Sequence, residues 1–139
     1  MTQYNRTAEY ACALIIRDKR ILLGRRAGFR AAYPCCWDVI GGKIETGETA
    51  DDALLRELGE EIAIVPQNPS FFDRLQDTHA NPVQPPVYHF YRIWDWQGGE
   101  PMINNHEHSH LDWFSLQQAC DLSNLALPEY RDLLTRALC

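Results

Sequence analysis

Residues 42–64 begin at the second glycine of a Gly-Gly pair and contain three closely spaced glutamates. Thr49 is a good helix N-cap and Asp52 follows at capping-box spacing, so the pattern predicts a helix over Thr49–Ile62. At about 100° per residue, the glutamates share one helix arc and the large apolar side chains occupy the neighbouring arc. We therefore expect acids that flank a buried helix face. The acids are Glu57, Glu60 and Glu61, and the apolar side chains are Leu54, Leu55, Leu58 and Ile62.

The local energetics of such a helix are unfavourable. Like charges three or four residues apart repel by about 0.2 to 0.5 kcal/mol per pair, and anions near the C-terminal end oppose the helix dipole. Gly59 costs about another 1 kcal/mol relative to alanine, and Arg56 is the one basic residue of the predicted helix. A hard divalent cation would offset the repulsion, because Mg²⁺ prefers oxygen ligands and often binds substrate phosphates as well. A solvated acidic face is the alternative, and three acids beside a core-facing surface favour the cation.

The same stretch resembles the Nudix box, a pattern of glycine, acids and arginine at fixed spacing. Ala63 stands where the pattern has its final glycine, and alanine has a steric cost in the left-handed conformation that ends many helices. Ile40 stands where many relatives carry proline, with an expected effect on loop stiffness alone. Eight of the nine specified positions match, namely Gly42, Glu48, Arg56, Glu57, Leu58, Glu60, Glu61 and Ile64.

The resemblance implies a fold and an activity. It implies one Nudix hydrolase domain over residues 1–139, folded as an α/β/α sandwich with a mixed sheet. MutT-like members of this family hydrolyse a nucleoside diphosphate linked to another moiety. Small size favours a nucleoside triphosphate as substrate, with a monophosphate and pyrophosphate as products. A non-catalytic Nudix-fold ligand sensor or interaction module is the alternative, and the intact acids favour the enzyme.

The resemblance also implies roles for the residues of the box. Mg²⁺, with Mn²⁺ as a substitute, would bridge the substrate phosphates and acidify a bound water. Glu57 or Glu60 would accept the proton of that water. Arg56 would orient the acids and pair with Glu48. The implied metal ligands are Glu57, Glu60, Glu61 and the carbonyl of Gly42, in a loop formed by Gly41 and Gly42.

Residues outside the box are candidates for substrate binding. Arg25 and Arg26 lie in a loop predicted over residues 24–36 and would reach the phosphates, with solvated surface charge as the alternative. Glu107 would supply an additional carboxylate as metal ligand or base, against the alternative of an exposed loop residue. The aromatic side chains of Tyr88, Phe90 and Trp94 alternate along one predicted strand, where they would stack on a base or belong to the core.

Residues 106–110, with the sequence HEHSH, formally match the zinc-protease signature H-E-x-x-H. That signature requires a helix, because only a helix places both histidines on one face with the glutamate beside them. Pro101, Asn104 and Asn105 precede the segment and a strand-like stretch follows it. We therefore expect no helix there and no zinc protease.

Composition and charge restrict the class of protein. A chain of 139 residues with 45% apolar side chains can build one substantial core. No apolar run of about 18 residues and no basic-then-apolar leader occur, so we expect a cytoplasmic protein without a membrane span. A net charge of −6 opposes a broad nucleic-acid-binding surface. The resemblance implies a small nucleotide as partner, and a homodimer stays open. Five cysteines without a CxxC pair are typical of reduced thiols, and Cys35–Cys36 are expected to pack.

The remaining pattern predicts strands on both sides of the central helix and helices at the end, which indicates a mixed α/β fold. Gln97–Glu100 is a predicted turn, because it contains two glycines. Ser115 is expected to cap a short helix through Leu122, and Pro128–Leu138 to form a final helix. The predicted strands are Tyr10–Ile16, Ile21–Leu23, Trp37–Ile40, Phe71–Asp77, Val87–Trp96 and a late strand at Trp113–Phe114.

Overall fold

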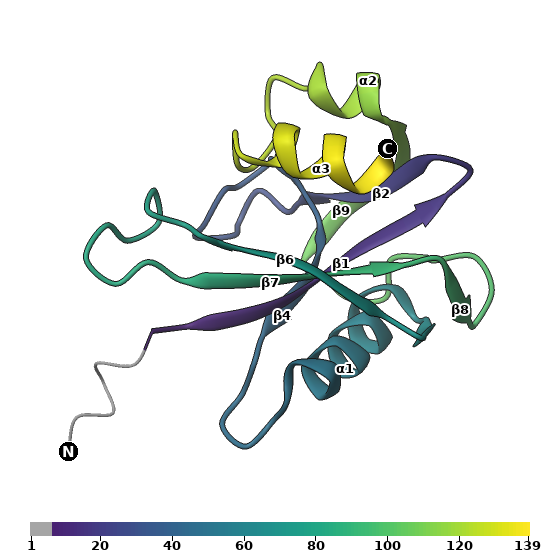
Figure 1. Ribbon diagram of the computed structural model, residues 1–139, viewed down its shortest axis with the longest axis horizontal. Coiled ribbons are helices and arrows are strands. Elements are labelled where there is room, and N and C mark those ends of the chain that lie inside the picture. Colours follow the sequence, from purple (N-terminus) through teal and green to yellow (C-terminus); the bar gives the residue numbers. More distant parts are fainter. Residues whose placement is uncertain (1–6) are drawn as a thin grey trace.

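The computed structural model describes residues 7–139, so residues 1–6 of the predicted domain lie outside the described part. Within it, seven strands form one sheet, with α1 on one face and α2 and α3 on the other (Figure 1). This arrangement is the predicted α/β/α sandwich. The elements are β1 (Glu9–Arg17), β2 (Arg20–Arg26), β3 (Trp37–Asp38), β4 (Ile40–Lys43), α1 (Ala50–Ile62), β5 (Val65–Gln67), β6 (Ser70–Gln76), β7 (Val87–Ile93), β8 (Asp95–Gln97), β9 (His108–Ser115), α2 (Leu116–Cys120) and α3 (Tyr130–Leu138).

The central strand β1 explains why the sheet is mixed. It pairs in parallel with β7 and antiparallel with β2 and β4. Side chains of a strand alternate between the two faces of the sheet. Leu14 and Ile16 therefore pack in the core under α3, whereas Ala13 and Ile15 pack in the core under α1. Burial on both faces accounts for the continuous apolar run of this strand.

Helix α1 begins and ends as predicted. The Thr49 side chain accepts a hydrogen bond from the Asp52 amide, and the Asp52 carboxylate accepts one from the Thr49 amide. Ala63 follows the helix in the left-handed conformation, with φ 58° and ψ 40°. Alanine thus occupies the conformation for which the family pattern uses glycine.

The prediction of which α1 residues are buried was wrong in two respects. Leu55 is 49% exposed and contributes little to the core, whereas Glu57 and Glu61 are buried. Both acids lie within the buried face instead of flanking it. Tertiary packing buries the acids, because α1 packs on β1 and β4 with the face that contains Leu54, Leu58 and both acids.

The glycine pair belongs to strand β4 and does not form the expected loop. Gly41 pairs with Cys12 and Gly42 with Ala11 on β1. A Cβ atom on Gly41 would collide with the Ala11 carbonyl, and one on Gly42 would collide with the Glu57 carboxylate. Glycine is therefore required at these positions because other groups approach closely.

Several predicted boundaries also needed correction. The predicted strand Val87–Trp96 divides into β7 and β8, and β8 pairs with β5 in a separate two-stranded sheet. The predicted loop at residues 24–36 begins later, because β2 continues to Arg26 through its pairing with β9. The turn at Gln97–Glu100 is present, with positive φ at Gly98 and Gly99.

Strand β9 is longer than the predicted late strand at Trp113–Phe114. It starts at His108 and includes the end of the HEHSH segment. The zinc-protease motif therefore lies on no helix, as predicted. Among the helices of the described residues, none has both the length and the apolar character needed to cross a bilayer.

Candidate functional site

Three carboxylates converge beside α1. Each of Glu57, Glu61 and Glu107 places one oxygen within 4.8 Å of the others. The first two share a helix face because they are four residues apart. Glu107 comes from the segment before β9, where its carbonyl accepts a hydrogen bond from the Ala27 amide at 2.9 Å. The pairing of β9 with β2 thus brings a distant acid to the helix.

Glu61 is the most deeply buried member of this carboxylate group. It is 1% exposed, and its Oε2 atom has no hydrogen-bond partner among the described residues. Burial, a hydrogen bond with Glu57 and the charge of Glu107 raise the pKa of the Glu61 carboxyl well above its usual range. A buried carboxyl oxygen without a hydrogen-bond partner lowers the free energy of unfolding unless a ligand binds it.

His108 lies next to Glu61 in the same buried region. Its Nδ1 atom is 3.5 Å from Glu61 Oε1 and also has no hydrogen-bond partner in the described chain. Burial, then the charges of Arg26 and Arg30, lower the pKa of the His108 imidazole to about 4. The ring is therefore neutral at neutral pH and adds no positive charge to the site.

Arg56 makes the predicted pairing with Glu48. Its Nε and Nη2 atoms bind the two Glu48 oxygens at 2.8 and 2.9 Å, and Nη1 binds Glu57 at 2.9 Å. The hydrogen bonds from Arg56 lower the pKa of the Glu48 carboxyl to about 2. Arg56 thereby fixes one side of the Glu57 carboxylate, which is a positioning role.

The structure does not place Glu60 in the carboxylate group. Its side chain is 56% exposed, and its carboxylate lies 3.6 Å from Arg56 Nη1. Of the three box glutamates on α1, Glu57 and Glu61 therefore face the site, whereas Glu60 is exposed to solvent. Its predicted role in metal binding and proton transfer stays a prediction.

The carboxylate group opens into a cavity of about 460 Å³. Arg26 lines this cavity and binds Asp38 at 3.3 Å, whereas Arg25 is outside the lining and donates to the Cys35 carbonyl. Arg30 also lines it and lies 3.1 Å from Glu107. Of the two arginines proposed from the sequence, the structure thus brings only Arg26 to the site. The rest of the lining includes four tyrosines, namely Tyr10, Tyr33, Tyr88 and Tyr130.

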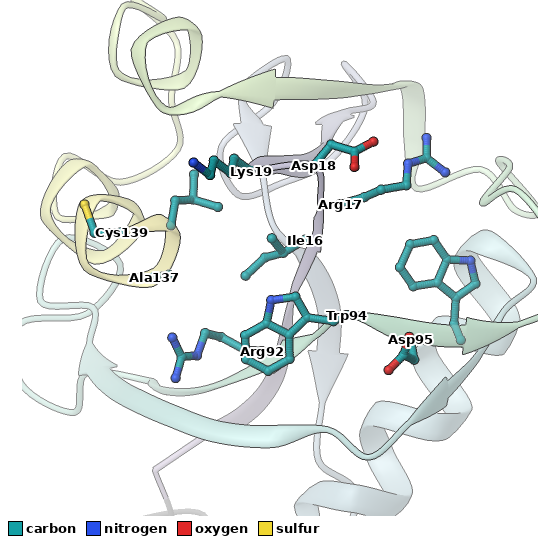
Figure 2. A pocket seen from close by; sticks show the side chains of 11 residues that line it. Ile16, Arg17, Asp18, Lys19, Arg92, Trp94, Asp95, Ala137 and Cys139 are labelled. Atoms are coloured by element: carbon teal, nitrogen blue, oxygen red, sulfur yellow. The ribbon is translucent and has the colours of Figure 1, made fainter.

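The three aromatic residues proposed for base stacking are in three different environments. Tyr88 lines the cavity beside the carboxylates, and Phe90 is fully buried in the core. Trp94 lies beyond the end of β7 and is 48% exposed. It lines another cavity, of about 590 Å³, with Lys19 and Arg92 (Figure 2). The carboxylate group does not line that cavity.

Sequence reasoning missed two acids that bind the tyrosines, namely Asp38, which lines the cavity, and Asp77, which is buried. Asp38 accepts a hydrogen bond from the Tyr130 hydroxyl at 2.7 Å. Asp77 accepts hydrogen bonds from the Tyr33 and Tyr88 hydroxyls. These partners are 11 to 92 residues apart along the chain, so no local pattern could have indicated the contacts.

Comparison with known proteins agrees with this fold. The sequence model of the NUDIX domain matches residues 6–137. The chain is 31% identical to a CTP pyrophosphohydrolase of Escherichia coli, over 80% of this chain and 78% of that protein. It is 34% identical to nucleoside triphosphatase NudI of Escherichia coli, over 60% of this chain and 64% of that protein. The crystal structure of a MutT NUDIX hydrolase from Burkholderia pseudomallei superposes with a TM-score of 0.81 at 28% identity, covering 94% and 98% of the two chains.

The chain belongs to the NUDIX domain family. The fold, the box residues and these relatives define a hydrolase that acts on phosphorus-containing anhydrides. Both the resemblance found in the sequence and the predicted class of enzyme are confirmed.

Proposed function

We propose that the protein hydrolyses the diphosphate linkage of a nucleoside triphosphate with a divalent cation, giving a nucleoside monophosphate and pyrophosphate. The observation that carries this proposal is the shared cavity, in which converging carboxylates, two arginines and four tyrosines line one space. Carboxylates suit a phosphate-binding cation, arginines suit phosphate oxygens, and tyrosine rings suit a planar base. The similarity to a CTP pyrophosphohydrolase and to a nucleoside triphosphatase supports this substrate class.

The residues fit a hard divalent cation such as Mg²⁺, with Mn²⁺ as a substitute. Three carboxylates offer oxygen ligands within 4.8 Å of one another, and the unpartnered Oε2 of Glu61 is buried among them. Glu57, Glu61 and Glu107 would hold the cation, and the carbonyl of Gly42 stays a proposed further ligand. When bound, the cation would neutralise phosphate charge and acidify a water molecule.

The remaining residues orient the substrate and the acids. Arg56, which does not line the cavity, keeps Glu57 in place and is itself held by the pair with Glu48. Glu57 is the favoured acceptor of the proton from the attacking water, because it lies within the carboxylate group, and Glu60 is the other candidate. Arg30, which contacts Glu107, and Arg26, which contacts Asp38, are available to the phosphates, and Lys43 also lines the cavity.

A substrate panel tests the proposal. Purified protein with Mg²⁺ would be incubated with nucleoside triphosphates, nucleotide sugars, ADP-ribose and dinucleoside polyphosphates, and the products identified by mass. Reaction in ¹⁸O-labelled water would show which phosphorus the water attacks. We expect cation-dependent release of monophosphate and pyrophosphate from at least one triphosphate. No turnover of any triphosphate by folded protein would refute the proposal.

A cytoplasmic location and a homodimeric state are further proposals that come from the sequence. Cell fractionation tests the location. Size-exclusion chromatography with light scattering tests the oligomeric state, and a monomeric mass at all concentrations would exclude the dimer.

A further inference from the structure

We propose that Asp77 is a positioning residue that sets the shape of the nucleobase pocket and thereby determines which bases the enzyme accepts. The proposal rests on the proposed hydrolysis of nucleoside triphosphates and deepens it. The observation behind it is a single buried carboxylate that holds three separate segments of the cavity wall. We call the group formed by Asp77, Tyr33 and Tyr88 the tyrosine latch.

The latch consists of short hydrogen bonds to one oxygen atom. Asp77 Oδ2 accepts from the Tyr33 hydroxyl at 2.6 Å and from the Tyr88 hydroxyl at 2.7 Å. These lengths are typical of charge-assisted bonds, which are about twice as strong as neutral ones. Oδ1 accepts from the amides of His79 and Ala80, both at 3.1 Å. All four groups that contact this carboxylate donate a hydrogen bond, so the contacts suit the ionised form.

The latch connects three segments that are distant in sequence. Tyr33 lies in the loop after β2, Tyr88 in β7, and Asp77 at the start of the loop between β6 and β7. The Asp77 amide also donates to the Pro86 carbonyl at 2.9 Å, which closes the base of that loop (Figure 1). Tyr33, Tyr88, Ala80 and Pro86 all line the cavity, whereas Asp77 does not. Asp77 therefore acts on a ligand only through the wall that it holds.

The charges around the latch keep both phenols protonated. Burial and the hydrogen bond to Asp77 raise the pKa of the Tyr33 and Tyr88 hydroxyls. Burial by itself would raise the pKa of Asp77, but the hydrogen bonds from both tyrosines and from the two amides outweigh it and lower this pKa. Each phenol proton is thus committed to Asp77 and unavailable to a ligand. The two hydroxyls can therefore accept a hydrogen bond from a base but cannot donate one, and the rings contact a base through their faces and edges.

Tyr10 is the cavity tyrosine that remains available for a polar contact. Its hydroxyl makes no hydrogen bond to another described residue, unlike those of Tyr33, Tyr88 and Tyr130. Its ring packs edge-on against Tyr88, with centroids 5.4 Å apart. A shift of Tyr88 would therefore move Tyr10 as well. Through this contact, Asp77 controls both the apolar wall and the one free phenol of the pocket.

The test uses the two products as separate probes. A nucleoside monophosphate carries the base, whereas pyrophosphate does not, so their inhibition constants report on different parts of the site. In the full-length Asp77→Asn variant, the amide cannot accept all four hydrogen bonds. We expect the inhibition constant of the monophosphate to rise about tenfold, because the released rings of Tyr33 and Tyr88 no longer keep the geometry that the base contacts, and that of pyrophosphate to stay within about twofold. We also expect a higher KM with little change in kcat, and a smaller spread of kcat/KM among bases.

The chain offers a matched control and a backup variant. Asp73→Asn makes the same change on β6, where Asp73 binds Arg136 outside the cavity, and should leave both constants unchanged. If Asp77→Asn does not fold, the double variant Tyr33→Phe/Tyr88→Phe keeps both rings and removes both latch bonds.

Two outcomes would overturn the proposal. One is a lowered thermal midpoint with unchanged product inhibition and base selectivity, which would make the latch purely structural. The other is an equal rise for monophosphate and pyrophosphate, which would indicate general distortion. If the wild-type protein turns over no nucleotide, the proposed function fails instead. Calorimetric titration with the monophosphate would still test the latch, because it needs binding alone.

Discussion

The burial of Glu61 predicts that the metal-free protein loses stability as the pH rises above neutrality. Burial, the bond with Glu57 and the charge of Glu107 raise the pKa of this carboxyl well above 4.5. Above about pH 6, the unfolded chain has therefore lost a proton that the folded protein still holds. A group with a raised folded pKa stabilises the fold fully below its unfolded pKa. That contribution is lost as the pH rises toward the folded value.

The size of the effect follows from the retained proton. One proton changes the free energy of unfolding by about −1.4 kcal/mol per pH unit. Between about pH 7 and pH 8.5 the loss is about 2 kcal/mol, or about 6 °C in the thermal midpoint of a domain of this size. His108, whose pKa burial lowers to about 4, acts in the opposite direction but only below about pH 6.5. Cys12, whose pKa burial raises well above 9.0, contributes only at higher pH.

Thermal melts in a chelating buffer over that pH range would measure the slope. Glu61→Gln should abolish it, because glutamine does not titrate. Glu60→Gln is the matched control and should retain it, because that side chain is 56% exposed. Saturating Mg²⁺ should reverse the sign, because binding requires the ionised carboxylate. A wild-type midpoint that stays constant or rises in chelator would refute the assignment of a proton to Glu61.

Three further substitutions test other parts of the site. Glu57→Gln should lower cation-dependent kcat much more than Glu60→Gln, because Glu57 belongs to the carboxylate group whereas Glu60 is 56% exposed; a larger loss in Glu60→Gln would make Glu60 the proton acceptor. Gly42→Ala should lower kcat at least about a hundredfold, because the added methyl group collides with the Glu57 carboxylate; unchanged steady-state kinetics would contradict this contact. Ala63→Gly should raise the free energy of unfolding by about 0.5 to 1 kcal/mol in denaturant titrations with unchanged kcat, because φ is 58° at this position; a destabilised variant would count against this account of the helix end.

Local signals in the sequence predicted helix α1 well. Thr49 and Asp52 form a capping box that needs only a few neighbouring residues, and both hydrogen bonds are present. The position of Ala63 also followed from a local pattern. Local patterns could not predict which side of the helix is buried, because that side depends on where β1 and β4 pack against it. Leu55 was expected inside and is exposed, whereas Glu61 is buried.

The composition of the site was predictable mainly within the box, although Glu107 and Arg26, which lie outside it, were also candidates. Glu57 and Glu61 were identified from their spacing, but their grouping with Glu107 depends on the pairing of β9 with β2. The contacts of Asp77 with Tyr33 and Tyr88 join two loops and strand β7, which meet only in the folded protein. An isolated aspartate between a strand and a proline-rich loop carries no signal of such a role.

The central claim is that the carboxylates of Glu57, Glu61 and Glu107 form one cation site that faces the substrate. Anomalous diffraction from crystals soaked with Mn²⁺ and a nucleoside monophosphate tests it most directly. We predict a strong anomalous peak at bonding distance from oxygens of these three residues, with the phosphate of the nucleotide beside it. A peak bound elsewhere, or a fully occupied nucleotide with no metal between it and these side chains, would contradict the claim.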